Sequence, residues 1–171
     1  MTAAPPDDLE ALAAHIAARL TAAAETRRGA WRTPVLATST PHGPSARVVV
    51  VRSVEAARRR LEIYTDARSA KPGEIAADPR VALTFWDDAA AEQLRMTGSA
   101  GAVEDAGAVA ARWRAIGPSG QALYGGDPER LVVLEMRWDA WDWLWIGAEP
   151  HRRARFTWAP DGTHRADWVD P

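Results

Sequence analysis

The sequence predicts a mainly β protein, a closed antiparallel barrel with flanking helices. Roughly seven short segments carry β-branched or alternating apolar residues, and turn residues separate most of them. Short strands joined by hairpins are typical of barrels. The chain has neither alternating strand–helix units nor a GxGxxG turn, which argues against a Rossmann domain.

Residues 7–28 are expected to form an amphipathic helix. Asp7 or Asp8 can cap its start, and Gly29 is expected to end it. Its apolar residues recur at steps of three and four positions: Leu9, Leu12, Ile16 and Leu20. This spacing places them on one face of the helix.

The next segment predicts an antiparallel hairpin. A short strand at 34–38 is followed by the turn sequence Pro-His-Gly-Pro at 41–44. A strand at about 46–53 then returns from the turn. It contains four consecutive valines, and β-branched residues favour packed positions in a sheet, so we expect this strand to be buried.

The later elements follow from alternation, turn residues and apolar spacing. Ser69 can cap a helical turn that Asp78-Pro79 ends, and Gly98 and Gly101 suggest a bulge or a close backbone approach. In chain order we expect a strand at 61–65, the helical turn at 69–77, strands at 81–86 and 93–103, a helix at 106–116, a loop at 117–128, one long strand or a broken pair at 131–136 and 143–146, and a closing hairpin at 153–158 and 164–168.

Length and composition limit the class of protein. We expect one domain over residues 1–171, with the helix at 7–28 and the barrel at about 30–169. A formal net charge of −2 gives no reason to expect nucleic acid or a membrane surface as partner. The chain has no cysteine, and its four histidines lack metal-ligand spacing, so no metal site is expected. An acidic start without a secretory signal, and the lack of a long apolar run, predict a cytoplasmic location.

The segment from Arg47 to Lys71 is the best candidate for a binding site. It reads Arg47-Val48-Val49-Val50-Val51-Arg52, then Tyr64-Thr65-Asp66, then Arg68-Ser69-Ala70-Lys71. Cations at both ends of a strand, followed by hydroxyl groups and a second pair of cations, suggest an anion site on a rigid sheet. Lys71 is the only lysine in the chain. The run at 58–60 is expected at a hairpin tip, where three arginines are most simply a solvated surface.

These motifs, taken in order, resemble the pyridoxamine 5′-phosphate oxidase-like FMN-binding split-barrel family. The resemblance covers roughly residues 30–158 and also includes Asp-Pro-Arg-Val-Ala-Leu-x-Phe-Trp, Gln-Leu-Arg-x-x-Gly and a late Trp145 with Arg155-Phe156. It implies a six-stranded split barrel and a homodimer with FMN at the dimer interface.

The resemblance also implies roles for individual residues. Arg47, Ser69 and Lys71 match phosphate-binding positions, and Arg52 matches a basic position near the flavin ring. The backbone of Val48, Val49, Val50 and Val51 would face the ring, and Tyr64 and Thr65 would line the cofactor. Gln93 suits the imide edge of the flavin, because its amide both donates and accepts hydrogen bonds. Trp145 and Arg155 would cover the cofactor from the C-terminal half, across the dimer.

Several of these residues have a competing structural interpretation. Tyr64 and Trp145 could be core aromatics, and Gln93 could be an exposed strand residue. Arg68 could contact the phosphate or the solvent, and we favour the solvent. The six tryptophans after residue 137 are expected to be mainly core or interface residues, with one or two lining the flavin.

The resemblance weakens on the substrate side. The family's Tyr-x3-Arg-x3-Ser series is missing from residues 113–119, and its late Arg-x-His pair appears here as His151-Arg152-Arg153. Oxidation of pyridoxamine phosphate itself is therefore not the expected reaction. His151 and Arg153 are the candidates for the substrate side, and no catalytic acid or base is assigned.

Three functions remain open at this point. The leading one is an FMN-dependent oxidoreductase that acts on a small organic molecule, with the flavin supplying the chemistry. The second is a non-catalytic FMN-binding or carrier protein. The third is a haem-binding or haem-degrading protein, with His42, His151 or His164 as candidate ligands.

Overall fold

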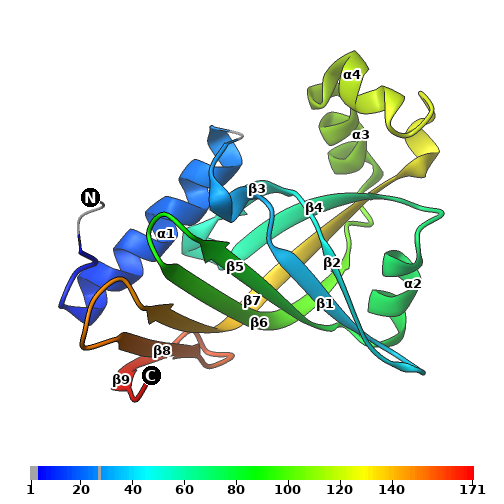
Figure 1. The fold of residues 1–171 in the computed structure, drawn as a ribbon. Coiled ribbons are helices and arrows are strands. Elements are labelled where there is room, and N and C mark those ends of the chain that lie inside the picture. Colours follow the sequence, from blue (N-terminus) through cyan, green and yellow to red (C-terminus); the bar gives the residue numbers. More distant parts are fainter. Residues whose placement is uncertain (1–3, 27) are drawn as a thin grey trace.

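The computed structural model describes residues 4–26 and 28–171, which form one antiparallel sheet with flanking helices (Figure 1). The strands are β1 Val35–Thr40, β2 Gly43–Val48, β3 Val51–Glu55, β4 Arg60–Asp66, β5 Arg80–Asp87, β6 Glu92–Ala102, β7 Leu131–Trp145, β8 Arg152–Trp158 and β9 His164–Val169. The helices are α1 Leu9–Glu25, α2 Ala70–Ala77, α3 Ala106–Ala115 and α4 Gly117–Ala122, with short 3-10 turns at Ala30–Arg32, Ala56–Arg58 and Pro128–Arg130.

The order of the strands explains why the sheet curls. Neighbours follow the path β2-β1-β5-β6-β7-β4-β3, so β2 and β3 lie at opposite ends of it. Only Val49 and Val50 separate these two strands along the chain. Three Cα–Cα steps join Val48 to Val51 and cover at most about 11 Å. The two ends of the sheet must therefore approach each other.

The sheet is nevertheless not closed, because no ladder joins β2 to β3 among the described residues. The predicted split barrel is confirmed, whereas the closed barrel is corrected. The sheet also has nine strands rather than six. The additional strands arise where the valine segment is divided and where β8 and β9 extend the sheet beside the C-terminal half of β7.

The valine run is not the continuous buried strand that its composition predicts. Strand β2 ends at Val48 and β3 begins at Val51. Between them the Val49 amide donates to the Pro34 carbonyl over 2.9 Å. Val49 and Val51 are buried at 8% and 1% exposure, but Val48 is 65% exposed. The run is the link between two edges of the sheet, and only part of it faces the core.

Two further differences lie in the C-terminal half. Residues 131–145 form the single long strand β7, and not a broken pair. The predicted loop at 117–128 contains the short helix α4, which follows α3 directly. Helices α3 and α4 project beyond the sheet (Figure 1), over a small apolar cluster that includes Tyr124, Leu131 and Val133.

Helix α1 packs on the core through the predicted apolar face. Leu12, Ile16 and Leu20 are buried, and the Asp8 carboxylate caps the helix by accepting a hydrogen bond from the Ala11 amide over 2.8 Å. The helix ends at Glu25, earlier than the predicted limit of residue 28, and residue 27 lies outside the described residues. None of the described helices is long and apolar enough to span a lipid bilayer.

An ion-pair network also fixes α1 to the sheet. Arg19 forms ion pairs with Asp87 and with Glu92, which is 1% exposed. Glu92 also accepts a hydrogen bond from Trp143 Nε1 over 2.5 Å. A buried carboxylate needs such partners, because its desolvation would otherwise be costly. The network sets the position of α1 along the barrel.

Gly98 of β6 lies opposite Trp138 at a register shift, where Asp139 is the extra residue and the bulge is therefore in β7. A Cβ at Gly98 would lie 2.1 Å from the Arg137 carbonyl oxygen, whereas a Cβ at Gly101 would meet nothing within 4 Å. The backbone approach at Gly98 therefore requires glycine.

We predict that Gly98→Ala lowers the free energy of unfolding by about 1–3 kcal/mol or more, because backbone must move to admit the methyl group. Gly101→Ala, in the same strand, is the matched control and should change stability by less than about 1 kcal/mol. Urea unfolding followed by tryptophan fluorescence measures both. Equal stability of the two variants would show that the Gly98 approach is not constrained.

Candidate functional site

A polar corner forms where β1 and β2 meet helix α2. The guanidinium of Arg47 on β2 donates to Thr38 Oγ1 over 2.5 Å and to Glu74 Oε2 over 2.7 Å. Thr38 also donates to Glu74 Oε2 over 2.7 Å. Thr38 is 3% exposed, so the three groups hold one another at the edge of the core. These contacts fix the orientation of the Arg47 fork.

The start of α2 adds hydroxyl and ammonium groups to this corner. Ser69 is the N-cap residue, as predicted, but its side chain makes no capping bond. Its Oγ lies 2.9 Å from Thr65 Oγ1 at the end of β4. Lys71 lies one turn before Glu74 and shares its helix face. No described residue accepts a hydrogen bond from the Lys71 ammonium, whose charge acts on Glu74. We call Arg47, Thr65, Ser69, Lys71 and Glu74 the α2 corner.

The charges of the α2 corner leave it positive. The hydrogen bond from Thr38 lowers the pKa of Glu74, and the hydrogen bond and charge of Arg47 act in the same direction against the opposing effect of burial. Glu74 is therefore ionised at neutral pH and balances one of the two cations. The other positive charge remains available to an anion.

Arg68 does not contribute to this corner. Its Nε and Nη2 atoms donate to the two carboxylate oxygens of Asp66 over 2.9 and 2.8 Å. Arg68 is exposed, so this ion pair agrees with the solvent position that the sequence analysis favours.

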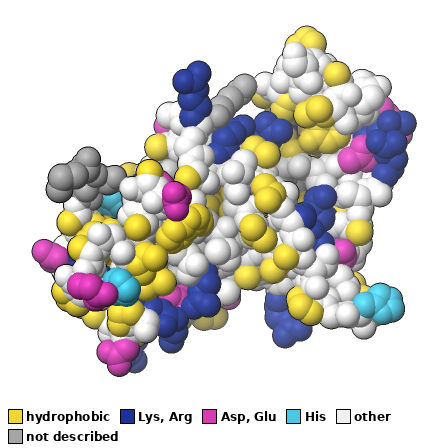
Figure 2. All heavy atoms as spheres, viewed as in Figure 1, with side chains coloured by type: hydrophobic (Ala, Val, Ile, Leu, Met, Phe, Trp, Pro, Cys, Tyr) yellow, Lys and Arg dark blue, Asp and Glu magenta, His cyan; other side chains and the backbone are white. Residues whose placement is uncertain are grey.

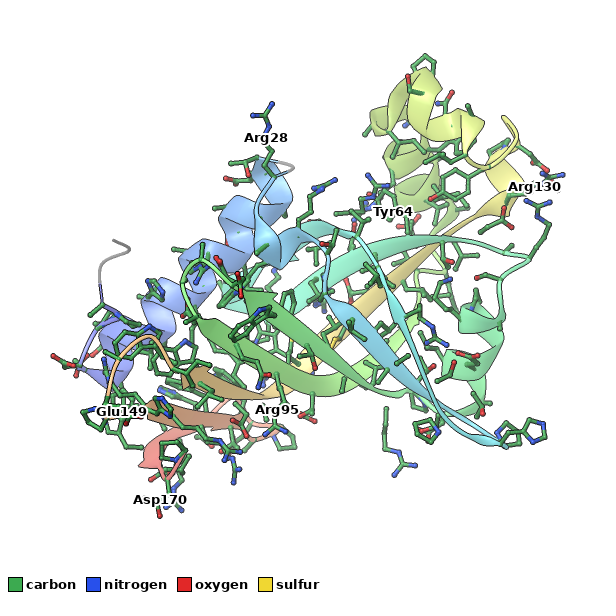
Figure 3. The ribbon with its side chains drawn as sticks, viewed as in Figure 1. Arg28, Tyr64, Arg95, Arg130, Glu149 and Asp170 are labelled. Atoms are coloured by element: carbon green, nitrogen blue, oxygen red, sulfur yellow. The ribbon has the colours of Figure 1, made fainter. Side chains whose placement is uncertain are left out.

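Arg52 and Tyr64 lie in a separate recess of about 160 Å³, whose other lining residues include Ala115, Ile116 and Gly120 of α3–α4. The Arg52 guanidinium carbon lies 5.6 Å from the centre of the Tyr64 ring. Arg52 Nε is buried and has no acceptor among the described residues. Figure 2 shows basic side chains gathered between the end of α1 and the α3–α4 pair, and Figure 3 places Tyr64 beside α3.

Burial raises the pKa of Tyr64 to about 12, and the charge of Glu62 adds to this effect. The phenol is therefore protonated throughout the physiological range. It can donate a hydrogen bond in the recess, but it cannot serve as a base there.

Gln93, Trp145 and Arg155 lie elsewhere in the chain. Gln93 is on β6 opposite Trp86 and Leu144, and Trp145 Nε1 donates to the Ala90 carbonyl over 3.1 Å. Arg155 on β8 lies 3.4 Å from Asp142. Strand β6 is three places from β2 in the sheet, or roughly 14 Å at the usual strand spacing. No hydrogen bond or ion pair joins this set to the α2 corner among the described residues.

Asp142 organises the cations near this second set. Its carboxylate accepts hydrogen bonds from Arg153 over 2.8 and 2.9 Å and from Arg95 over 2.6 Å. Figure 3 places Arg95 beside the sheet near β8. Burial alone would raise the pKa of Asp142, but the hydrogen bonds from Arg153 and Arg95 outweigh this effect and lower it to about 2.

The two predicted substrate residues lie at the start of β8 and just before it. His151 is exposed and its Nε2 lies 3.2 Å from Glu149 Oε1. Arg153 is held by Asp142, and Arg152 donates to the carbonyls of Pro5 and Pro6. The structure does not bring these residues to the α2 corner.

The sequence analysis missed Thr38, Glu74 and Asp142. Glu74 follows Lys71 by three residues, so helical spacing alone places the two on one face. No comparable signal marks Thr38 or Asp142, because their arginine partners come from other strands.

The N-terminal part of the chain carries the family relationship. Residues 13–104 match the family model described as pyridoxamine 5′-phosphate oxidase, FMN-binding domain. This match covers more than half of the chain, and the chain therefore belongs to that family. Its cofactor is FMN.

Curated relatives match a shorter segment. A pyridoxine/pyridoxamine 5′-phosphate oxidase of Granulibacter bethesdensis is 47% identical over 69 residues, which are 38% of this chain and 32% of that protein. One of Rubrobacter xylanophilus is 44% identical over 68 residues, 39% of this chain and 30% of that protein. The matches thus span about a third of the length of these relatives.

Solved structures confirm the fold over the whole chain. A pyridoxamine 5′-phosphate oxidase-related, FMN-binding protein of Nostoc punctiforme superposes with a TM-score of 0.76 at 23% identity and full coverage of both chains. PhzG of Burkholderia lata, solved with tetrahydrophenazine-1-carboxylic acid, gives a TM-score of 0.72 at 17% identity, covering 98% of this chain and 94% of that one.

The described residues fit this cofactor. FMN carries a dianionic phosphate, and the α2 corner offers an oriented guanidinium, a hydroxyl pair and an ammonium without an acceptor. The buried Arg52 Nε, which lacks an acceptor among the described residues, offers a further donor on the other side of the valine link.

The lowered pKa of Asp142 predicts acid sensitivity of stability. Because its folded-state pKa lies below the ordinary value of 3.8, the ionised carboxylate stabilises the fold above about pH 4, and this contribution is lost as the pH falls toward 2. Asp142→Asn should lower the free energy of unfolding by about 1–2 kcal/mol at pH 7.

The check is urea unfolding of the Asp142→Asn variant and the parent at several pH values between 6 and 3. The variant should lose less stability over this range than the parent, and Asp88→Asn, at an exposed aspartate, should follow the parent. Parallel curves for parent and Asp142→Asn would contradict the assignment.

Proposed function

We propose that this protein is an FMN-dependent oxidoreductase that acts on a small organic molecule, and that the α2 corner binds the FMN phosphate. The observation that carries the proposal is the arrangement of Arg47, Thr38 and Glu74 beside an ammonium without an acceptor. FMN supplies the redox chemistry when it is bound, and the protein supplies position and charge.

Each residue of the corner has a distinct part in this proposal. Arg47 donates through its oriented fork, Lys71 contributes a mobile charge, and Ser69 and Thr65 contribute hydroxyl donors. The ring would extend along residues 48–51 toward Arg52 and Tyr64. The backbone at Val49 and Val50 lies outside the strand ladders, although the Val49 amide is already bonded to Pro34.

The proposal includes a homodimer in which Gln93 and Arg155 reach the cofactor of the partner. Trp145 is left out, because it pairs with the buried Glu92 on the opposite face and packs against the core. The register places Gln93 on the same face of the sheet as Trp86, Val35 and Val48, since cross-strand partners share a face. Trp86, Val35 and Val48 are 43%, 40% and 65% exposed, so three large apolar side chains are in contact with solvent on one face of the sheet. A second copy that covers this face would bury them.

The substrate is proposed to differ from pyridoxamine phosphate. A second phosphate needs its own cations, but the α3–α4 wall of the recess offers Ala115, Ile116 and Gly120. Arg153 is bound to Asp142, and His151 lies beside Glu149, so both are already engaged. Pyridoxal 5′-phosphate formation by the flavin-loaded protein would overturn this part of the proposal.

No contact among the described residues favours the two alternative functions, a non-catalytic FMN carrier and a haem-binding protein. The three candidate haem ligands, His42, His151 and His164, are all exposed. A haem site needs an axial ligand beside an apolar cavity, and the recess at Tyr64 and a second pocket at Trp138 are lined by none of these histidines.

We predict that Arg47→Ala and Lys71→Ala each weaken FMN binding by about 1.5–3 kcal/mol, through loss of a charge-assisted bond to the phosphate. Fluorescence titration of the apoprotein with FMN measures the affinity. Arg68→Ala is the matched control, because Arg68 lies three residues from Lys71 but is bound to Asp66. Unchanged affinity in both test variants would refute the phosphate assignment.

We predict that the flavin-loaded protein is a dimer, with twice the chain mass of 18.6 kDa in light scattering. Trp86→Arg should shift the mass toward the monomer by placing a charge in the proposed interface. Leu123→Arg alters a residue that is 72% exposed beyond α4 and should leave the dimer intact. A monomer mass for the flavin-loaded parent protein would overturn the proposed assembly.

A further inference from the structure

Strand β7 forks near its middle. Its N-terminal half pairs with β4, up to the partners Arg60 and Arg137. Its C-terminal half pairs on the same side with β8, beginning at Ala140 and Thr157. A groove of about 540 Å³ opens at this fork, between the start of β4 and the end of β8.

Aromatic rings form one side of the groove. Trp138 and Trp141 lie at the fork itself and are 1% and 3% exposed. Their ring centres are 5.4 Å apart, and Trp158 at the end of β8 packs edge-on against Trp141 at 4.9 Å. All three line the groove. Trp158 is partly exposed, whereas Trp138 and Trp141 are almost wholly buried. Trp158 therefore presents the indole surface against which another ring can pack.

Four arginines also line the groove, and two of them have no acidic partner. Arg58 pairs with Glu55 and Arg60 with Glu135, each at 3.2 Å. The side chains of Arg59 and Arg137 form no ion pair or hydrogen bond with any described residue, and no carboxylate lines this groove. Asp139 lines an adjoining hollow and accepts a hydrogen bond from Thr97. The groove therefore carries uncompensated positive charge.

The aromatic side of the groove also contains unsatisfied donors. The Nε1 atoms of Trp138 and Trp141 are buried, and neither has an acceptor among the described residues. A buried indole N–H usually finds an acceptor. Trp31 Nε1 and Arg52 Nε are in the same state elsewhere, but only here do two such donors belong to adjacent rings that line one groove.

The groove is separate from the α2 corner. Arg60 begins β4 and Asp66 ends it, so the two sites lie at opposite ends of one strand, roughly 20 Å apart. A molecule bound in the groove would leave the α2 corner free for FMN.

We propose that the β7 fork is a second binding site and that it takes a planar aromatic anion of the aryl carboxylate class. The two free guanidinium groups match the fork geometry of a carboxylate, and the partly exposed Trp158 packs against the ring. The volume lies within the range of small-molecule sites. Neither feature alone selects this ligand, because a simple inorganic anion would not use the indoles and a neutral arene would not use the arginines.

The test is isothermal titration calorimetry on the flavin-loaded protein with 2-naphthoate and with the neutral 2-naphthalenemethanol. Naphthoate should bind at least roughly tenfold more tightly than the alcohol, and the flavin absorbance should not change. Equal affinities, absence of naphthoate binding, or displacement of FMN by naphthoate would each overturn the proposal.

Substitutions of groove residues, measured by the same titration, test whether the ligand binds in the groove. The double variant Arg59→Asn with Arg137→Gln should lose the preference for naphthoate, and asparagine is chosen because Arg59 has a φ of 57°, which asparagine tolerates. Trp158→Leu should weaken both ligands. Arg28→Gln is the control, since Figure 3 shows Arg28 projecting away from the body. Identical naphthoate affinity in the double variant and the Arg28→Gln control would place the site elsewhere.

Discussion

The constraint on which the structure depends is the short link formed by Val49 and Val50. It joins β2 and β3, which lie at opposite edges of the sheet, and so requires the sheet to curl until the edges approach. The same link separates Arg47 from Arg52. Arg47 is thereby presented to helix α2, whereas Arg52 enters the recess beneath α3–α4. The placement of the two cations on either side of the link is a consequence of how the sheet is assembled.

Charge placement then distinguishes the residues that can hold an anion from those that cannot. Arg47 is oriented by Thr38 and Glu74, which reduces the entropy that a ligand must remove on binding. Arg47 and Arg68 each pair with a carboxylate, Glu74 and Asp66, but only the Arg47–Glu74 pair has a second cation, Lys71, acting on its carboxylate. At the β7 fork the same reasoning separates Arg58 and Arg60, which have acidic partners, from Arg59 and Arg137. The net charge of the chain is close to zero, so bulk charge does not attract an anion to any one place. Which arginines are available to an anion is decided by their local acidic partners.

Sequence reasoning predicted the parts that depend on local chemistry. The face of α1, the Asp8 cap, the strands around Phe85 and the approach at Gly98 follow from spacing, capping groups and glycine geometry. It failed where pairing partners decide the outcome. The four valines have the same strand preference, so composition alone cannot show where the run is divided. The division at Val49 arises because the residues before it pair with β1 and the residues after it pair with β4. Glycine and proline at 117–120 predict a loop, but the first turn of a helix tolerates proline, and α4 forms there.

The central claim is that the α2 corner recognises a phosphate. The most direct measurement compares the affinity of the apoprotein for FMN and for riboflavin, which differ only in that group. The account predicts that riboflavin binds at least roughly 100-fold more weakly, since two or more charge-assisted bonds are absent. Equal affinities, or a protein that takes up neither flavin, would contradict it.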